Sequence, residues 1–222
     1  MEIVWFGLNF FRFSERGMAT IVTDPYAPEV GLPLPHPRAD VITLSSNDPQ
    51  NGYTRGVRGP FRVLDTPGEY EIGGVFITAI ATYADKRRGA ERGLNTIFHF
   101  DYDGLTICHL GNLGHPPTQT QVEALGTVDV LLVPVGGDSG LTPAQAAEVI
   151  SMLEPSLVIP MRYKTPGLTL PLGTLNRFLK QMGLEKARTE DSLKISARTL
   201  PSETEIVVLN PQSGSKGGKN GA

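Results

Sequence analysis

Residues 128–161 read VDVLLVPVGGDSGLTPAQAAEVISMLEPSLVIPM. The nearly continuous apolar run at 128–135 predicts a fully buried strand. Thr142-Pro143-Ala144-Gln145 has the pattern of a capping box with proline at the first helical position, so a helix is expected over 143–153. The apolar run Leu157–Met161 then predicts a second strand. A strand, a helix and a strand within about 30 residues predict two parallel neighbouring strands.

Short strands dominate the chain before this unit. The runs that predict them are β-branched or aromatic and are bounded by turn-forming residues. They are Ile3–Phe6, Thr20–Val22, Val41–Leu44, Arg62–Leu64, Val75–Ala81, Asn95–Phe100 and Leu105–Leu110. Asp103-Gly104 lies between the last two and is a strong β-hairpin signal.

Two more helices and a last pair of strands complete the pattern. Thr118-Gln119-Thr120-Gln121 fits another capping box, which would open a short helix that Gly126 ends. A third helix is expected over Leu172–Met182, and strands over Ser192–Ala197 and Glu205–Leu209. Strands first, followed by strand–helix alternation, imply packed sheets with helices outside.

Composition indicates an ordinary globular chain of 222 residues, 40% of them hydrophobic. We read 1–210 as one domain, because no Pro/Ser-rich linker divides it, and 211–222 as a disordered tail. Lys plus Arg is 20 and Asp plus Glu is 23, so neither nucleic acid nor a membrane surface is expected as a partner. No signal sequence or long apolar segment is apparent, so a cytoplasmic protein is expected. Cys108, the single cysteine, is expected to be a small core residue.

Isolated motifs point to no established chemistry. Gly136-Gly137-Asp138-Ser139-Gly140 reads as a helix-entry loop, with an anion contact as the alternative. Ser45 and Ser46 read as turn formers at a strand end. Glu69 and Glu71 alternate on an expected strand and so share a face, but nothing local would split their pKa values as a general acid/base pair requires.

The four histidines are His36, His99, His109 and His115. None has the short spacing that nucleates a zinc site. His99 and His109 are expected on opposite arms of one hairpin, where they could stack or hydrogen-bond to each other. His115 ends a loop at a strand terminus, where functional residues often collect.

Several segments in family order resemble the metallo-β-lactamase superfamily, in particular the branch similar to L-ascorbate-6-phosphate lactonase. They include Val4–Gly7, Thr23–Tyr26, Ala39–Thr43, Pro67–Gly74, Gly93–Ile97, Ile107–His115, Val128–Gly137 and Val158–Thr165. The resemblance implies an α/β fold, the αββα four-layer sandwich of two mixed β-sheets flanked by helices. It also implies a metal site of histidines and a bridging aspartate, where a metal-bound hydroxide attacks the substrate.

The residues at the metal-ligand positions differ from the family pattern. The segment His-x-His-x-Asp-His corresponds to Ser46-Asn47-Asp48-Pro49-Gln50-Asn51. The histidine of Tyr-His-Asp is Ala84, the bridging aspartate is Asn112, and the histidine of Pro-Met-His-Tyr-Lys is Arg162. We therefore expect no metal cofactor. A guanidinium would instead replace the metal charge, pairing with Asp48, Asp24 or Asp85 and hydrogen-bonding Asn51 and Asn112.

Three functions follow from this comparison. The first is a non-catalytic, or metal-free, protein that binds a small anionic ligand or a partner in the former metal pocket. The pocket candidates are Asp24, Ser46, Asp48, Asn51, Ala84, Asp85, Asn112, His115 and Arg162. The alternative is a metal-dependent hydrolase with a rearranged, oxygen-rich mononuclear site, which would use Asp48 and His115 with manganese or zinc. The third is a structural subunit of a homo-oligomer.

Overall fold

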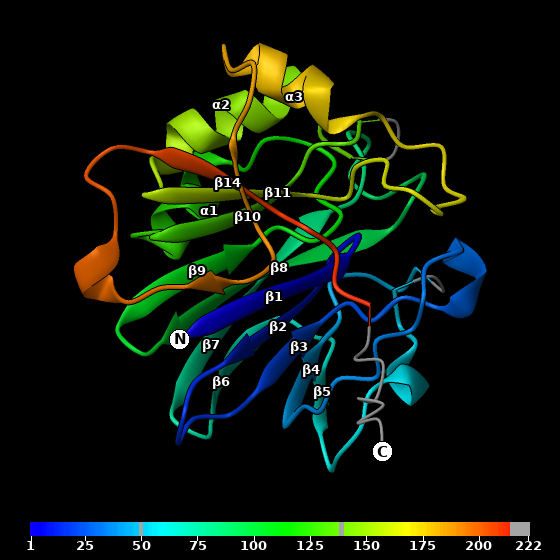
Figure 1. Cartoon of the computed structure of the whole chain (residues 1–222), viewed down its shortest axis with the longest axis vertical. Helices are drawn as coiled ribbons and strands as arrows, with labels where there is room; N and C mark the ends of the chain where they lie inside the picture. The colour runs from blue at the N-terminus through cyan, green and yellow to red at the C-terminus, as the bar shows by residue number, and fades with distance from the viewer. Residues whose placement is uncertain (49–50, 138–139, 214–222) are drawn as a thin grey trace, which may run out of the picture.

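Two β-sheets packed face to face form the centre of the molecule (Figure 1). The computed structural model describes residues 1–48, 51–137 and 140–213. The six-stranded sheet has the order β13-β1-β2-β3-β4-β5, and the eight-stranded sheet has the order β12-β14-β11-β10-β9-β8-β7-β6. Each sheet contains both parallel and antiparallel pairs. The predicted architecture of two mixed sheets is confirmed.

The strands of the six-stranded sheet come mainly from the first third of the chain. They are β1 (Glu2–Gly7), β2 (Phe10–Ser14), β3 (Ile21–Thr23), β4 (Val41–Thr43), β5 (Arg62–Leu64) and β13 (Leu193–Lys194). The strands of the other sheet are β6 (Gly68–Ile72), β7 (Val75–Tyr83), β8 (Leu94–Tyr102), β9 (Leu105–His109), β10 (Val130–Pro134), β11 (Leu157–Met161), β12 (Arg188–Glu190) and β14 (Glu205–Leu209). The predicted parallel pair is present, because Val130 pairs with Leu157 in β10 and β11.

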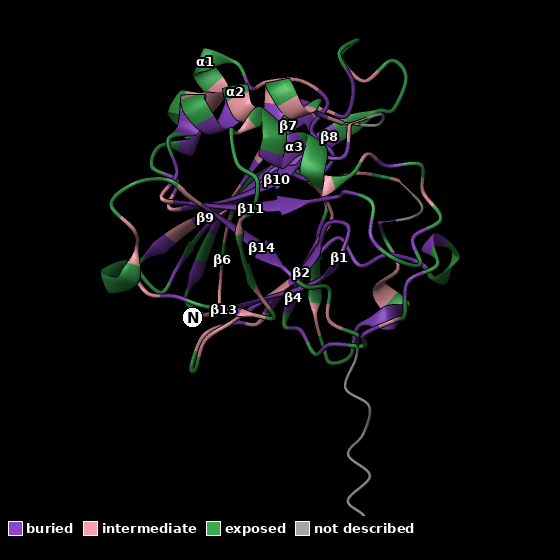
Figure 2. Ribbon diagram, turned by 45° about the horizontal axis from the view of Figure 1, so that its top comes forward, coloured by how far each residue is buried: buried purple, intermediate pink, exposed green. Residues whose placement is uncertain are grey.

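Helices α1 (Gln119–Leu125), α2 (Pro143–Leu153) and α3 (Leu175–Gln181) cover one side of the eight-stranded sheet. Figure 2 shows their exposed outer surfaces above buried strands. Both predicted capping boxes are formed: the Thr118 side chain accepts from Gln121 N–H, and the Thr142 side chain accepts from Gln145 N–H. Short 3-10 helices η1 (Pro28–Val30), η2 (Thr54–Gly56) and η3 (Ala197–Thr199) lie in the connections.

Helix α3 begins three residues later than the predicted range 172–182. The preceding segment is held in a non-helical path, because Lys164 N–H donates to Gly173 O at 2.9 Å and Gly173 N–H donates to Gly136 O at 2.7 Å. Leu172 is buried against the outer face of the six-stranded sheet instead of on a helix. Tertiary packing thus overrides the local apolar spacing.

The sequence analysis missed strands β2 and β12, and it predicted β13 four residues too long. Three of the five residues of β2 are phenylalanines packed on both faces, so the strand lacks a simple alternation. The hairpin at Asp103-Gly104 is confirmed. His99 and His109 do not meet across it. His99 pairs with Cys108 and His109 pairs with Phe98, so the two histidines are not opposite each other. Instead, His99 Nε2 lies 3.1 Å from Thr127 O, and His109 Nε2 lies 3.1 Å from Asn9 O.

Two apolar clusters stabilise this arrangement. The larger lies between the sheets and under the helices, and includes Trp5, Phe98 and the buried Cys108, as expected for a core cysteine. The smaller covers the outer face of the six-stranded sheet, where Tyr26 and Leu168 from loops pack on strand residues. Burial of these side chains supplies the main driving force for folding.

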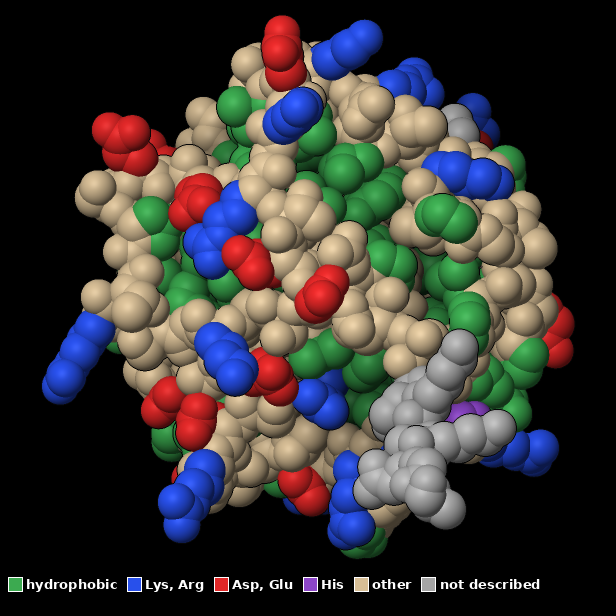
Figure 3. All heavy atoms as spheres, viewed as in Figure 1, with side chains coloured by type: hydrophobic (Ala, Val, Ile, Leu, Met, Phe, Trp, Pro, Cys, Tyr) green, Lys and Arg blue, Asp and Glu red, His purple; other side chains and the backbone are tan. Residues whose placement is uncertain are grey.

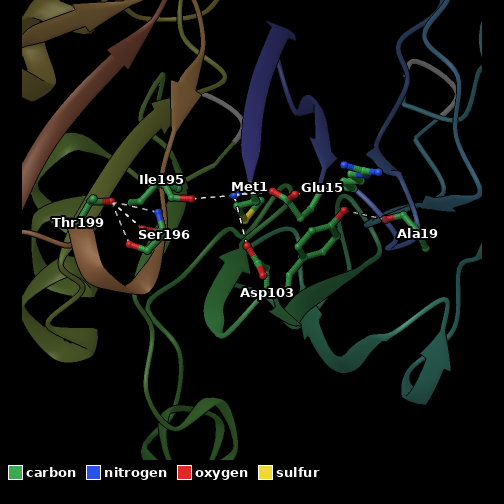
Figure 4. Close-up of polar contacts among 9 residues, drawn as sticks. Met1, Glu15, Ala19, Asp103, Ile195, Ser196 and Thr199 are labelled. Carbon is green, nitrogen blue, oxygen red and sulfur yellow. Dashed lines mark hydrogen bonds and ion pairs between the residues drawn. The ribbon is translucent and has the colours of Figure 1, made fainter.

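Polar contacts tie the two sheets together at one end of β1. Figure 4 shows the amino group of Met1 between Glu15, Asp103 and the backbone oxygen of Ile195. The distance to Glu15 Oε2 is 2.9 Å and the distance to Ile195 O is 2.8 Å. These contacts join β1 and β13 to the turn between β8 and β9. The first residue of the chain therefore helps to hold the two sheets together.

The surface carries both signs of charge. On the face shown in Figure 3, basic and acidic side chains are interspersed. Among the described residues, no helix is long and apolar enough to cross a membrane. Gln212, which lies beyond the expected domain boundary at residue 210, contacts the first strand: its N–H donates to Trp5 O at 2.8 Å. The rest of the expected tail, 214–222, lies outside the described residues.

The close contact between Gly136 and the residue that follows β11 gives the first prediction. A Cβ at Gly136 would clash with the backbone oxygen of Arg162, whereas a Cβ at the exposed Gly52 would meet nothing within 4 Å. We expect Gly136→Ala to lower the free energy of unfolding by about 1–3 kcal/mol. Urea denaturation measures the change, with Gly52→Ala as the matched control. Equal stability of the two variants would contradict the close packing.

Candidate functional site

A cavity of about 780 Å³ lies where the carboxyl ends of β4, β7, β9 and β11 converge. Five of the nine predicted pocket residues line it: Ser46, Asp48, Ala84, Asn112 and Arg162. Its other lining residues are Asn47, Glu91, Arg92, Gly93, Leu94, Leu170, Pro171 and Leu172. The cavity is in the size range of small-molecule sites.

Arg162 is the central charged residue of the cavity. It follows β11 directly and is only 6% exposed. Its backbone N–H donates to Leu8 O at 3.3 Å, so the six-stranded sheet helps to fix it. Its φ of 52° lies in the left-handed region, which costs a non-glycine residue about 1 kcal/mol or more. A strained, buried cation at a strand end is a feature typical of functional sites.

The charge of Arg162 is balanced by nearby carboxylates. Burial lowers the pKa of the guanidinium, while the negative charges of Asp48 and Asp24 raise it and the positive charge of Arg92 lowers it. An arginine remains protonated under these conditions. The negative charges of Asp48 and Asp24 thus act on Arg162, and their direct pairing with its guanidinium stays a prediction.

Asp24 is completely buried at the end of β3, with a φ of 39°. Its carboxylate accepts hydrogen bonds from Ser45 N–H at 2.6 Å and from Ser45 Oγ at 2.5 Å. Burial raises the pKa of Asp24 to about 7, although the Ser45 hydrogen bonds, the charge of Arg162 and the amide of Asn9 all lower it. Near neutral pH this carboxyl group therefore exists in both protonation states.

A chain of side-chain amides crosses from one sheet to the other beneath the cavity. Asn9 Nδ2 donates to Asn112 Oδ1 at 2.6 Å, and Asn112 Nδ2 donates to Ser46 Oγ at 3.1 Å. The backbone N–H of Asn112 donates to Asn95 Oδ1 at 2.7 Å. A Cβ at Gly111 would clash with Ser45, so the glycine permits this close approach of the sheets.

Asp85 does not serve as a partner of Arg162. Its carboxylate accepts backbone hydrogen bonds from Arg87, Gly89, Glu91 and Arg92. Burial would raise the pKa of Asp85, but these four N–H groups together lower it. Asp85 therefore folds the loop that brings Glu91, Arg92 and Gly93 to the cavity, which is a structural role.

Two other predicted residues lie outside the cavity lining. Asn51 is completely buried, and its side-chain amide makes no hydrogen bond with any described residue, so the expected bond to Arg162 is not formed. His115 is half-buried beside Tyr83, and its Nδ1 lies 2.7 Å from Pro116 O. Gln50 and part of the Gly136–Gly140 motif lie outside the described residues.

Sequence reasoning missed four participants in the site. Ser45 was read as a turn former, but it anchors Asp24. Asn9 and Asn95 carry the amide chain, and Leu94 forms part of the cavity wall. An uncharged polar residue directly before or near the start of a strand was the available signal for Asn9 and Asn95. Their hydrogen-bond partners are distant in sequence, so the sequence alone did not indicate which residues they would contact.

The donor groups at the family's metal-ligand positions do not fit a zinc ion. They are the hydroxyl of Ser46, the carboxylate of Asp48, the amides of Asn51 and Asn112, and the guanidinium of Arg162. Among residues 1–48, 51–137 and 140–213, no group of three or more His, Cys, Asp or Glu side chains is arranged to hold a metal ion. A guanidinium has no lone pair to offer and repels a cation.

Asp24 gives a pH-dependent prediction. Its folded-state pKa of about 7 lies above the ordinary value of 3.8, so the folded protein binds more protons and loses stability as pH rises from 4 to 8. Asp24→Asn keeps both Ser45 contacts and removes this titration, which is worth on the order of 4 kcal/mol at most.

We therefore expect the free energy of unfolding in urea to fall less steeply between pH 5 and pH 8 in Asp24→Asn than in the wild type. The exposed Asp101 provides a control as Asp101→Asn, which should retain the wild-type pH dependence. An identical pH dependence in the wild type and Asp24→Asn would contradict the raised pKa.

Comparisons with known proteins agree with the fold. A family model described as a β-lactamase superfamily domain matches residues 2–162. A UPF0173 protein of Pyrococcus furiosus is 27% identical over 187 residues, covering 74% of this chain and 84% of that protein. A UPF0173 metal-dependent hydrolase of Methanoculleus marisnigri is 28% identical over 187 residues, covering 74% and 82%.

A solved structure from Thermotoga maritima is also similar. That protein is named as a candidate zinc-dependent hydrolase of the metallo-β-lactamase superfamily. It is 38% identical to this chain, with a TM-score of 0.77, and the match covers 94% of this chain and 97% of the other. The family match spans both sheets and ends at Arg162, which lines the cavity. The chain belongs to the metallo-β-lactamase superfamily.

Proposed function

We propose that this protein binds a small anionic molecule in the cavity without a metal ion, and that Arg162 supplies the positive charge that a metal ion supplies elsewhere in the superfamily. The observation that carries the proposal is the burial of Arg162 at the position that the family resemblance assigns to a metal ligand. An arginine recognises carboxylate or phosphate groups through charge-assisted hydrogen bonds. In this proposal the protein is non-catalytic.

The two arginines of the cavity support an anionic ligand. Arg92 lines the same cavity and adds a second positive charge. Asp24, with a pKa of about 7, is partly neutral at physiological pH and then offsets Arg162 incompletely. Asn112 and Ser46 add uncharged polar groups to the same wall. An incoming anion would therefore meet two arginines, with uncharged polar groups beside them.

The alternative is a metal-dependent hydrolase with an oxygen-rich mononuclear site, and the names of the relatives favour it. Asp48 and His115 would be its ligands, with manganese or magnesium fitting the oxygen donors better than zinc. Against it, His115 does not line the cavity, and Asp48 lies close enough to Arg162 to raise its pKa. A third possibility is a structural subunit of a homo-oligomer.

Three finer assignments belong with this proposal. The likeness to the L-ascorbate-6-phosphate lactonase branch is compatible with an anionic ligand. We propose a cytoplasmic location on the same grounds as the sequence analysis. The absence of nucleic-acid and membrane partners is also proposed from the mixed charge of the chain.

Sulfate tests the proposed anion site, because its charge stays constant between pH 6 and 8. Titration calorimetry should detect binding that Arg162→Gln weakens at least about tenfold, whereas Arg198→Gln, which alters an exposed arginine, should not. Affinity should rise as pH falls from 8 to 6, because Asp24 then loses the charge that opposes the anion. Urea denaturation of Arg162→Gln checks that the variant folds. Binding unchanged in Arg162→Gln would overturn the proposal.

Metal content separates the proposal from its alternative. Untagged protein, before and after incubation with zinc or manganese and then dialysis, should carry less than about a tenth of an equivalent by elemental mass spectrometry. About one equivalent that survives dialysis and is lost in Asp48→Asn would instead establish the mononuclear site.

A further inference from the structure

Part of the cavity lining is apolar, and it lines the same space as the polar groups of Arg162, Asn112 and Ser46. Leu94 contributes from the start of β8, and Leu170, Pro171 and Leu172 contribute from the segment before α3. Leu94 is 64% exposed, more than the other exposed large apolar residues Val63, Phe76 and Leu184. An exposed leucine in the lining of a cavity can be covered by the apolar part of a bound ligand.

Both parts of this apolar wall are held in place. Leu94 pairs with Tyr83 in the β7–β8 ladder, and Ala84 N–H donates to Gly93 O at 3.1 Å. On the other side, Leu172 N–H donates to Leu170 O at 2.9 Å, and Leu172 is buried in the outer apolar cluster. The wall is therefore present before any ligand arrives, which reduces the ordering cost of binding.

The charges in the cavity limit the ligand to a small number of negative charges. Asp48 and Glu91 line the cavity together with Arg162 and Arg92. Glu91 also forms an ion pair with Arg87 at 3.2 Å. A ligand with several phosphates would meet more repulsion from these carboxylates than a ligand with a single carboxylate would.

Building on the proposed function, we propose that the ligand is an amphiphilic monocarboxylate. Its carboxylate would bind at Arg162, and its short aliphatic or aromatic body would lie against Leu94, Leu170 and Leu172. Leu94 is then a specificity-determining residue: it recognises the apolar body and makes no contribution to the binding of the carboxylate. Each methylene group that the wall covers should increase affinity about threefold to fourfold.

A series of straight-chain carboxylates tests this inference on the intact protein. We expect the affinities of acetate, butanoate and hexanoate, measured by titration calorimetry at pH 7, to rise about threefold or more for each added methylene group. Leu94→Thr should flatten this dependence on chain length, with a larger loss of affinity for hexanoate than for acetate. Phe76→Thr alters another exposed apolar residue of the same sheet, 56% exposed and outside the cavity lining, and should keep the wild-type dependence.

The outcomes distinguish this inference from the proposed function. If neither sulfate nor any carboxylate binds the wild type, the proposed function fails. If all carboxylates bind as weakly as acetate, or if Leu94→Thr keeps the full dependence on chain length, only the amphiphilic ligand is excluded. Butyl phosphate carries a phosphate in place of the carboxylate. Tighter binding of butyl phosphate than of butanoate would overturn the assignment to a carboxylate.

Discussion

Burial of the Arg162 guanidinium between the two sheets is the interaction on which the polar end of this molecule depends. A charge taken out of water is costly unless partners compensate for it. Here the partners come from the opposite sheet: Asp24 and Asp48 follow β3 and β4 of the six-stranded sheet, whereas Arg162 follows β11 of the eight-stranded sheet. Burial of the apolar faces stabilises the packing of the two sheets. The charges of these residues determine which side chains lie near one another at the shared edge.

The metallo-β-lactamase scaffold explains why a cavity exists at this edge. Parallel strands of each sheet end there, so the loops after them converge on one space. The superfamily is named for chemistry that requires metal ligands, and relatives of this chain are named as metal-dependent hydrolases. In this chain a guanidinium and amides occupy the positions that the resemblance assigns to those ligands. The fold is therefore shared, while the function must be argued from the residues of the site.

Local sequence signals predicted most of the fold. Capping boxes at Thr118 and Thr142 specify helix starts through hydrogen bonds between near neighbours, so both could be predicted and both are formed. Strand β2 and the start of α3 depend on contacts with distant residues, which a local pattern does not contain. At the site, the charge partners Asp24 and Asp48 were predicted. The role of Asp85 depends on the backbone path of residues 87–92, which only the structure reveals.

X-ray diffraction from crystals soaked in both zinc and selenate would test the central claim most directly, because anomalous scattering distinguishes the two elements. The account predicts a selenium peak within hydrogen-bonding distance of the Arg162 guanidinium, with oxygen–nitrogen separations of about 3 Å, and no zinc peak in the cavity. A zinc peak bound by Asp48, with Arg162 turned away from it, would contradict the account.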